Sequence, residues 1–335
     1  MLYEKNADEK RLIASLTKIM TALVVLERTD PEETVCVRPE WTDVEGSKMG
    51  LVPGETLTVG DLLKGVLLSS GNDAALALAE HCAGSAGAFA EMMNEQAAEL
   101  GLDSTRFENP HGLDGPEQYS TARDLAALAA AAMSNADFAA IVGMRSASAA
   151  GRTLVNHNKL LDMLEGCVGV KTGYTDAAGR TLVSCVEREG MRLICVTLCD
   201  GNDWNDHIAL CGWALDSFEA VSPLEALAIS PMPVISGEAA DVALVPERPC
   251  RLLCPKGAEL EVRIEKEKFI YAPVLRGEPA GKARVYVGEV EADCVPLVCA
   301  SGVALDRAIP LTAWEKIKWA WYLVHRHTPY IYPMM

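Results

Sequence analysis

Apolar residues near the start of the chain recur at helical spacing, in the run Ile19, Met20, Leu23, Val24 and Leu26. This run predicts an amphipathic or buried helix over residues 15–27. Ser15 and Lys18 stand in its first turn, and because positions i and i+3 share a helix face, their side chains point the same way. A neutral amine can take the proton of a neighbouring hydroxyl, and burial, nearby positive charge and the helix N-terminus all favour the neutral form. The two residues are therefore a candidate nucleophile and base, although many surface helices contain this spacing.

Helical spacing continues well beyond this first helix. Capping signals of the form T-x-x-D precede two apolar runs, at Thr58 and at Thr121. The polar loop 69–72 separates two of the helices, and taken alone it is best explained as a turn with Asn72 as a helix cap. The helices predicted in this region cover residues 62–67, 73–81, 89–100 and 121–133.

Strand patterns appear next along the chain. Residues 167–175 are partly β-branched and bounded by glycine, and the segments 180–187 and 191–199 flank a Glu-Gly turn as the arms of a hairpin. A helix over 207–218 closes this region. Residues 1–225 are therefore predicted to form an α+β domain in which a helical cluster packs against an antiparallel sheet.

A proline-marked linker follows this first domain. Residues 232–305 then alternate short apolar segments with turns that contain glycine and proline, which predicts a small all-β domain. No group of residues in it suggests chemistry. Residues 306–335 form a separate, aromatic-rich tail.

Composition narrows the classes of function. Half of the 335 residues are hydrophobic, so the chain can bury a sizeable core. The net charge of −17 argues against a nucleic-acid surface and against electrostatic binding of the whole body to anionic lipid. Residues 1–6 lack the apolar segment of an export signal, and no apolar run is long enough to span a membrane, so we expect neither in this chain.

Cysteine is frequent but shows no ligand pattern. The eleven cysteines include no CxxC pair and no Cys/His cluster at zinc spacing. We expect most of them to be small buried hydrophobic residues rather than a disulfide framework. No metal or cofactor site is predicted.

A third motif joins the serine–lysine pair. Lys171 and Thr172 alternate on the predicted strand, and Gly173 allows a ligand to approach the backbone closely. The combination of S-x-x-K, a Ser-x-Asn loop and K-T-G is the motif set of class A β-lactamases and penicillin-binding proteins. Here the three elements occur in that order, at a helix start, in a loop between helices and on a strand.

On these motifs the chain resembles the serine D-alanyl-D-alanine carboxypeptidases, the low-molecular-mass penicillin-binding proteins of the peptidase S11 family. Ser-Gly-Asn at 70–72 and the presence of the β-domain both distinguish it from class A β-lactamases. The resemblance covers essentially the whole chain and implies a β-lactamase/transpeptidase-like catalytic domain followed by the β-domain. The segments that carry it are 14–21, 69–75, 109–113, 120–124, 169–175 and 272–274.

The resemblance implies cofactor-free acyl transfer that removes the terminal D-alanine from peptidoglycan stem pentapeptides, with β-lactams as covalent inhibitors. Ser15 is expected to attack the carbonyl between the two D-alanines, and Lys18 to act as the base. Ser70 is expected to relay the proton to the leaving amine, and Asn72 to orient the substrate amide and Lys18. Such a general base contributes about 10²–10⁴-fold in rate.

The substrate-binding residues implied by the resemblance are Lys171, Thr172, Gly173 and Tyr174. Lys171 is expected to keep Lys18 neutral, Thr172 to bind the terminal carboxylate, and the N–H groups of Ser15 and Tyr174 to form the oxyanion hole. Many relatives add an arginine from the final helix of the catalytic domain. At that place the chain has Asn205-Asp206-His207, so His207 is a candidate substitute, while His157 is taken as structural.

Two alternative interpretations stay open. The first keeps the scaffold with a different reaction, and the second keeps no catalytic activity. A β-lactamase or a DD-endopeptidase is the alternative within the class, and rapid turnover of penicillin is what marks a β-lactamase. A catalytically silent cell-wall binding protein is the alternative from another class. The resemblance also implies an extracytoplasmic protein, peripheral on the outer face of the cytoplasmic membrane.

The tail itself suggests contact with a membrane. Its aromatic and aliphatic residues recur at 3-4-3 spacing, which predicts an amphipathic helix over 309–325 with one apolar face. Tryptophan and lysine suit the headgroup boundary, and the interspersed charges favour a helix lying on the bilayer rather than crossing it. A helix packed back on the β-domain is the alternative. The residues concerned are Trp314, Ile317, Trp321 and Val324 on the apolar face, with Lys316, Lys318 and Arg326 as basic neighbours.

Overall fold

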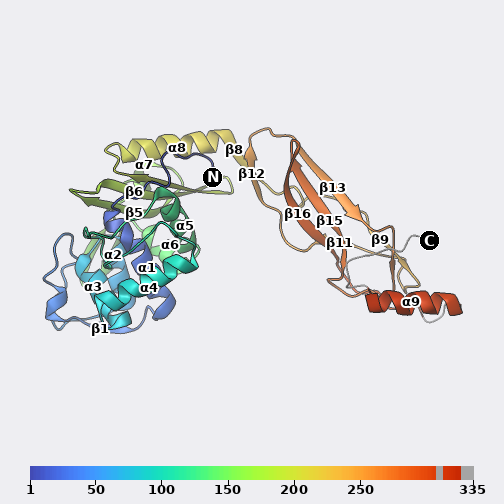
Figure 1. Ribbon diagram of the computed structural model, residues 1–335, viewed down its shortest axis with the longest axis horizontal. Helices are drawn as coiled ribbons and strands as arrows, with labels where there is room; N and C mark the ends of the chain where they lie inside the picture. The colour runs from blue at the N-terminus through green and yellow to red at the C-terminus, as the bar shows by residue number, and fades with distance from the viewer. Residues whose placement is uncertain (307–311, 326–335) are drawn as a thin grey trace. The chain divides into compact units, whose positions relative to one another are not determined.

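The computed structural model describes residues 1–306 and 312–325 (Figure 1). The chain divides into two compact units, Met1–Ser217 and Phe218–Met335. This division lies a few residues before the predicted boundary at 225. The reason is that strand β8 (Phe218–Val221) pairs with strand β12 (Leu252–Pro255), which belongs to the second unit.

The first unit is built around helix α1 (Thr17–Arg28), whose first nine residues are all buried. A short 3-10 helix, η1 (Ala14–Leu16), leads into it. Helices α2 to α6 all contact α1, so its polar positions are enclosed together with its apolar ones. The other helices are η2 (Pro39–Trp41), α2 (Val59–Leu67), α3 (Asn72–Ala83), α4 (Ala86–Glu99), α5 (Ala122–Ala132), α6 (Ala136–Val142) and α7 (Leu160–Met163).

The main sheet of this unit has the order β5-β6-β7, with β5 at an edge and both pairs antiparallel. Helix α8 (Asp203–Ser217) covers one face of the sheet, and the helical cluster covers the other (Figure 1). The α+β prediction is confirmed, as is the predicted hairpin. Two further antiparallel sheets of two strands each contact the helical cluster. The strands are β5 (Cys167–Thr175), β6 (Gly179–Arg188), β7 (Met191–Leu198), and the pairs β1 (Thr34–Cys36) with β2 (Thr56–Thr58) and β3 (Ser146–Ala149) with β4 (Arg152–Val155).

Local sequence signals explain most helix starts here. Thr58 and Thr121 each accept a hydrogen bond from the backbone N–H three residues on, at 3.1 Å, as the capping pattern predicted. Helix α8 begins at Asp203, earlier than the predicted 207. The carboxylate of Asp203 accepts from the N–H of Trp204 at 2.8 Å, so the first turn starts at the acidic residue rather than at the apolar run.

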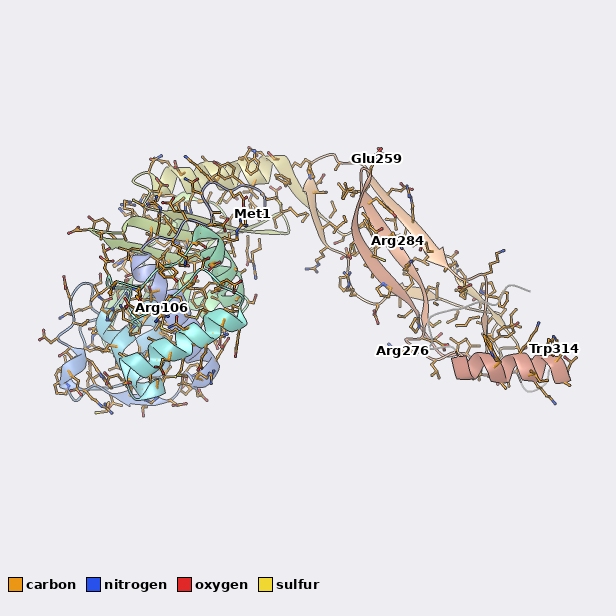
Figure 2. The ribbon with its side chains drawn as sticks, in the orientation of Figure 1. Met1, Arg106, Glu259, Arg276, Arg284 and Trp314 are labelled. Atoms are coloured by element: carbon orange, nitrogen blue, oxygen red, sulfur yellow. The ribbon has the colours of Figure 1, made fainter. Side chains whose placement is uncertain are left out.

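The part of the second unit that was predicted to be a β-domain, residues 232–305, is built of strands and turns. Its largest sheet has the order β11-β16-β15-β13, and a second has the order β10-β9-β14. Arg284 of β15 bonds to Glu265 of β13 and Glu291 of β16 across the large sheet (Figure 2). Its described residues include two clusters of buried apolar side chains. The strands are β9 (Met232–Ile235), β10 (Asp241–Val242), β11 (Leu244–Pro246), β13 (Leu260–Lys266), β14 (Ile270–Tyr271), β15 (Pro279–Val287) and β16 (Val290–Cys299).

The tail contains helix α9 (Ala313–His325). The first residues of the predicted helix, 309–311, and Arg326 lie outside the described residues. Trp314, which Figure 2 labels, is 65% exposed, and Ile317 and Trp321 are also exposed. Across residues 1–306 and 312–325, no single helix has the length and apolar character needed to cross a membrane. The pair α5 and α6, bent by 109°, meets both criteria together.

All eleven cysteines are free thiols. Five are buried, four are partly buried, and Cys36 and Cys199 are exposed. The expectation that most cysteines are buried is therefore met by five of the eleven, and none of the eleven forms a disulfide.

Candidate active site

Ser15 and Lys18 meet at the start of the central helix. The Nζ atom of Lys18 lies 2.9 Å from Oγ of Ser15, 2.7 Å from Oδ1 of Asn72 and 2.5 Å from the carbonyl oxygen of His111. The last two atoms can only accept hydrogen bonds. A neutral amine therefore donates its two N–H groups to Asn72 and His111 and turns its lone pair to the Ser15 hydroxyl.

Burial favours the neutral form of this amine. The side chain of Lys18 is fully buried, and this lowers its pKa well below its usual value. The positive charge of Lys171 lowers the pKa further, and the carboxylate of Asp73 partly opposes the shift. Lys18 is thus prepared to accept the Ser15 proton.

The polar loop 69–72 brings the second serine to the site. Ser70 is held with φ +59°, in the left-handed region that costs a non-glycine residue roughly 1–3 kcal/mol and that clusters at functional sites. Its Oγ atom accepts a hydrogen bond from Nζ of Lys171 at 3.1 Å. The loop therefore joins the S-x-x-K helix to the K-T-G strand.

Asn72 does not cap helix α3. Gly71 occupies the cap position without a side-chain bond, and Asn72 is the first helical residue. Its amide nitrogen donates to the carbonyl oxygen of Glu45 at 2.6 Å, which fixes Oδ1 toward Lys18. The explanation of this loop as a simple capped turn is wrong, because the side chain is used within the site.

Strand β5 forms the opposite wall. Lys171 is 1% exposed, and its Nζ donates to the backbone oxygen of Thr172 at 2.9 Å as well as to Ser70. Burial lowers the pKa of Lys171 to about 7. A Cβ atom added to Gly173 would lie 3.0 Å from the backbone nitrogen of Ser15, so glycine is needed for this close approach.

The loop 109–113 supports the base, which the sequence alone did not indicate. The side chain of Asn109 accepts from the N–H of Gly112 at 2.7 Å and donates to the oxygen of Leu113 at 2.9 Å. Gly112 has φ +88°, and a Cβ there would collide with the carbonyl of Ala14. The loop is therefore shaped to bring the His111 carbonyl onto Lys18.

These residues border a pocket of about 500 Å³. Ser15, Ser70, Thr172, Gly173 and Tyr174 line it, while Lys18, Asn72 and Lys171 are buried beside it. The structure thus brings the predicted residues together, with the exception of His207. Lining residues that were not predicted are Ser47, Arg180, Thr181, Asp203 and Trp204, and His157, taken as structural, also lines the pocket.

His207 does not belong to this pocket, and its prediction as a carboxylate ligand is wrong. The ring is fully buried between α8 and the sheet, with Nδ1 2.7 Å from Ser184 Oγ and Nε2 3.1 Å from Thr197 Oγ1. Burial lowers its pKa to about 4, so the ring is neutral near pH 7. A neutral imidazole with both nitrogens in use has no site for a carboxylate.

Comparison with known proteins places this geometry in a family. The family model described as D-alanyl-D-alanine carboxypeptidase matches residues 1–202, and the model of the penicillin-binding protein 5 C-terminal domain matches 218–304. The chain is 32% identical over 299 residues to D-alanyl-D-alanine carboxypeptidase DacF of Bacillus subtilis, covering 84% of this chain and 77% of that one. It is 33% identical over 302 residues to DacA of Escherichia coli K12, with 84% and 75% covered.

Solved structures agree with the sequence comparison. Penicillin-binding protein 5 from Haemophilus influenzae superposes with a TM-score of 0.73 at 32% identity, covering 90% of this chain and 93% of that chain. The predicted resemblance and fold class are therefore confirmed. The chain belongs to the peptidase S11 family of D-alanyl-D-alanine carboxypeptidases.

Proposed function

We propose that the protein is a serine carboxypeptidase that removes the terminal D-alanine from peptidoglycan stem pentapeptides through an acyl-enzyme on Ser15. The observation that carries this proposal is the arrangement around Lys18. Two carbonyl oxygens take its N–H groups, and its lone pair is left for the Ser15 hydroxyl 2.9 Å away. The family membership of the chain supports the same substrate class.

Acylation begins with proton transfer. The Ser15 proton passes to Nζ of Lys18 while Oγ forms a bond to the carbonyl carbon between the two D-alanines. The N–H groups of Ser15 and Tyr174 stabilise the oxyanion, and losing one such donor costs about 10²–10³-fold in rate. The C–N bond then breaks, the leaving amine takes a proton through the Ser70 hydroxyl, and D-alanine departs.

Deacylation returns the enzyme to its starting state. A water molecule attacks the Ser15 ester, with Lys18 again as the base. The shortened peptide then leaves with a new carboxylate. Asn72 orients both Lys18 and the substrate amide. Lys171 supplies positive charge, Gly173 lets the strand approach Ser15, and Thr172 binds the terminal carboxylate.

Mapping the covalent adduct tests the mechanism. After incubation with a fluorescent penicillin, peptide mass spectrometry should locate the label on Ser15. Ser15→Ala should abolish labelling, and Lys18→Ala should slow it by about 10²–10⁴-fold. A label on another residue contradicts the assignment of Ser15, and the absence of any label on folded protein favours a catalytically silent binding protein.

Product analysis separates the remaining alternatives. Release of D-alanine from a pentapeptide, with slow loss of the penicilloyl label, is the expected result. Rapid turnover of penicillin marks a β-lactamase, and cleavage of crosslinked dimers without release of D-alanine marks an endopeptidase.

We further propose that the tail places the enzyme on the outer face of the cytoplasmic membrane. In α9, Trp314, Ile317 and Trp321 are all exposed, and Nζ of Lys318 lies 5.8 Å from the centre of the Trp314 ring. Aromatic rings with adjacent lysines suit the headgroup boundary. The basic character of this segment contrasts with the overall charge of −17.

Co-sedimentation with anionic liposomes tests the tail. The full chain should pellet with vesicles, and a chain truncated after Asp306 should remain in the supernatant with unchanged thermal stability. Equal behaviour of both chains, together with a loss of stability on truncation, indicates instead that the tail packs on its own domain.

A further inference from the structure

The pocket wall contains a cation that the predicted mechanism does not use. Arg180 of β6 lies opposite Tyr174 of β5 in the strand register, and both line the pocket. Among the described residues that line it, Arg180 is the only lysine or arginine. Its side chain is 41% exposed, so the guanidinium is available to a ligand.

The guanidinium is held in place along one edge. Its Nε and Nη2 atoms donate to Oδ1 of Asp203 at 3.1 and 2.6 Å, and the Asp203 side chain is only 3% exposed. The carbon Cζ of Arg180 lies 5.3 Å from the centre of the Trp204 ring. Because Asp203 takes the Nε and Nη2 groups, the Nη1 amino group remains for a further acceptor. Because the guanidinium is already held by Asp203 and Trp204, less conformational entropy is lost when a ligand binds to it.

The other groups at this wall are poorly suited to hold a carboxylate by charge. Thr172 is neutral, and Lys171 is buried with its Nζ already donating to Ser70 and to the Thr172 backbone. Helix α8, from Asp203 to Ser217, has no lysine or arginine. A permanently charged planar donor is the usual partner of a carboxylate.

Resting on the proposed carboxypeptidase function, we propose that Arg180 binds the terminal carboxylate of the peptide together with the Thr172 hydroxyl. Asp203 is then a positioning residue that fixes the guanidinium. The carboxylate recognition that the sequence assigned to His207 on α8 is supplied from strand β6. The competing role for the same atoms is an ion pair that only fastens α8 to the sheet.

Paired substrates distinguish these roles. The kinetics of a D-alanyl-D-alanine peptide and of its C-terminal amide are measured for the full chain and for Arg180→Gln, Arg180→Lys and Asp203→Asn. For the acid peptide, kcat/KM of Arg180→Gln should fall about 10- to 100-fold, the value of one charge-assisted bond, mainly through KM. The amide should be unaffected, Arg180→Lys should recover part of the loss, and Asp203→Asn should give a smaller rise in KM.

Arg188→Gln is the matched control. It lies on the same strand, is 42% exposed and pairs with carboxylates, but it is not a pocket-lining residue. It should leave both substrates unchanged. Parallel losses on acid and amide for Arg180→Gln, or no loss on either, overturn the proposal. If Arg180→Gln does not fold, the acid-to-amide ratio of Arg180→Lys and Asp203→Asn decides.

The same data keep this proposal separate from the proposed function. A full chain that labels with penicillin but hydrolyses neither peptide contradicts the carboxypeptidase function. A full chain that prefers the acid peptide, with the preference retained in Arg180→Gln, contradicts only the role of Arg180.

Discussion

The buried lysines at the pocket of the first unit and Arg284 on the large sheet of the second unit carry positive charge in opposite surroundings. In the first, Lys18 and Lys171 are almost completely buried and contact only hydroxyl and carbonyl oxygens. In the second, Arg284, which Figure 2 labels, is partly exposed and donates hydrogen bonds to the carboxylates of Glu265 and Glu291. The two buried amines bond to no carboxylate, whereas the partly exposed guanidinium bonds to two.

The pKa values of these groups follow the same division. Burial lowers the pKa of both lysines, whereas the hydrogen bonds that Arg284 donates to Glu291 and Glu265 raise its own pKa, and a hydrogen bond from Lys282 lowers that of Glu265. A paired surface charge is a stable charge with little reactivity. A buried amine with only neutral partners changes its protonation state readily, which is what a base requires.

The largest effect on acylation is expected from the substitution of Gly173, and its cause is steric. In Gly173→Ala the new Cβ would lie 2.5 Å from Thr181 Oγ1 and 3.0 Å from the Ser15 nitrogen, so β5 must move away from the nucleophile. Losing the oxyanion donor geometry should slow penicillin acylation by about 10²–10³-fold. The measurement is the rate of Ser15 labelling.

Gly212→Ala provides the control for that substitution. Gly212 lies in α8 with nothing within 4 Å of an added Cβ. Alanine favours the helix by about 1 kcal/mol, so stability should rise and acylation should not change. Acylation of Gly173→Ala at the rate of the unmodified protein would show that the close approach of β5 is unimportant.

Much of this site was predictable because its parts obey local rules. The placement of Ser15 and Lys18 on one helix face depends on helical periodicity, and the strand 167–175 that carries Lys171 was predicted from its β-branched residues and bounding glycines. The structure places β5 at Cys167–Thr175, as predicted. The short connection between β5 and β6 places residue 180 opposite Tyr174. The closeness of Arg180 to the K-T-G strand could therefore have been predicted from the two strands.

The remainder depends on contacts between distant parts of the chain. The His111 carbonyl reaches Lys18 across 93 residues, and Asp73 binds the backbone N–H groups of Met49, Gly50 and Leu51. Neither contact has a periodic signature. His207 was misassigned because its place in the sequence does not reveal the helix phase, which turns the ring inward to Ser184.

An intermediate effect is expected from the titration of Lys171. Its pKa of about 7 means that its positive charge is present below that pH and is lost above it. For a peptide acid, kcat/KM should therefore fall by up to about tenfold per pH unit above pH 7. At lower pH it should fall as Lys18 becomes protonated, and the two lysines are expected to titrate as a coupled pair.

The pH profile of Lys171→Arg tests this assignment. Arginine keeps its charge throughout the range, so the alkaline limb should disappear if the variant retains activity. An alkaline limb at the same pH in both proteins would assign it to another group. The rate of penicillin labelling, measured over the same pH range without any peptide, shows whether the acylation step itself becomes slower above pH 7.

The smallest effect is expected on thermal stability, from the Asp293–Arg248 ion pair of the second unit, and only at acidic pH. Asp293 accepts from Nη1 and Nη2 of Arg248, at 2.9 and 2.5 Å, and these bonds lower its pKa from 3.8 to about 2. A lowered carboxyl pKa contributes stability that is present above 3.8 and is lost as the pH falls through 2. In Asp293→Asn the thermal midpoint of the full chain should therefore depend less on pH across this window.

Asp241→Asn, which removes an exposed carboxylate of β10, is the control and should retain the pH dependence of the unmodified protein. Acylation of Ser15 near pH 7 should be the same in all three proteins, and a change in that rate for Asp293→Asn would contradict the division of roles between the two units.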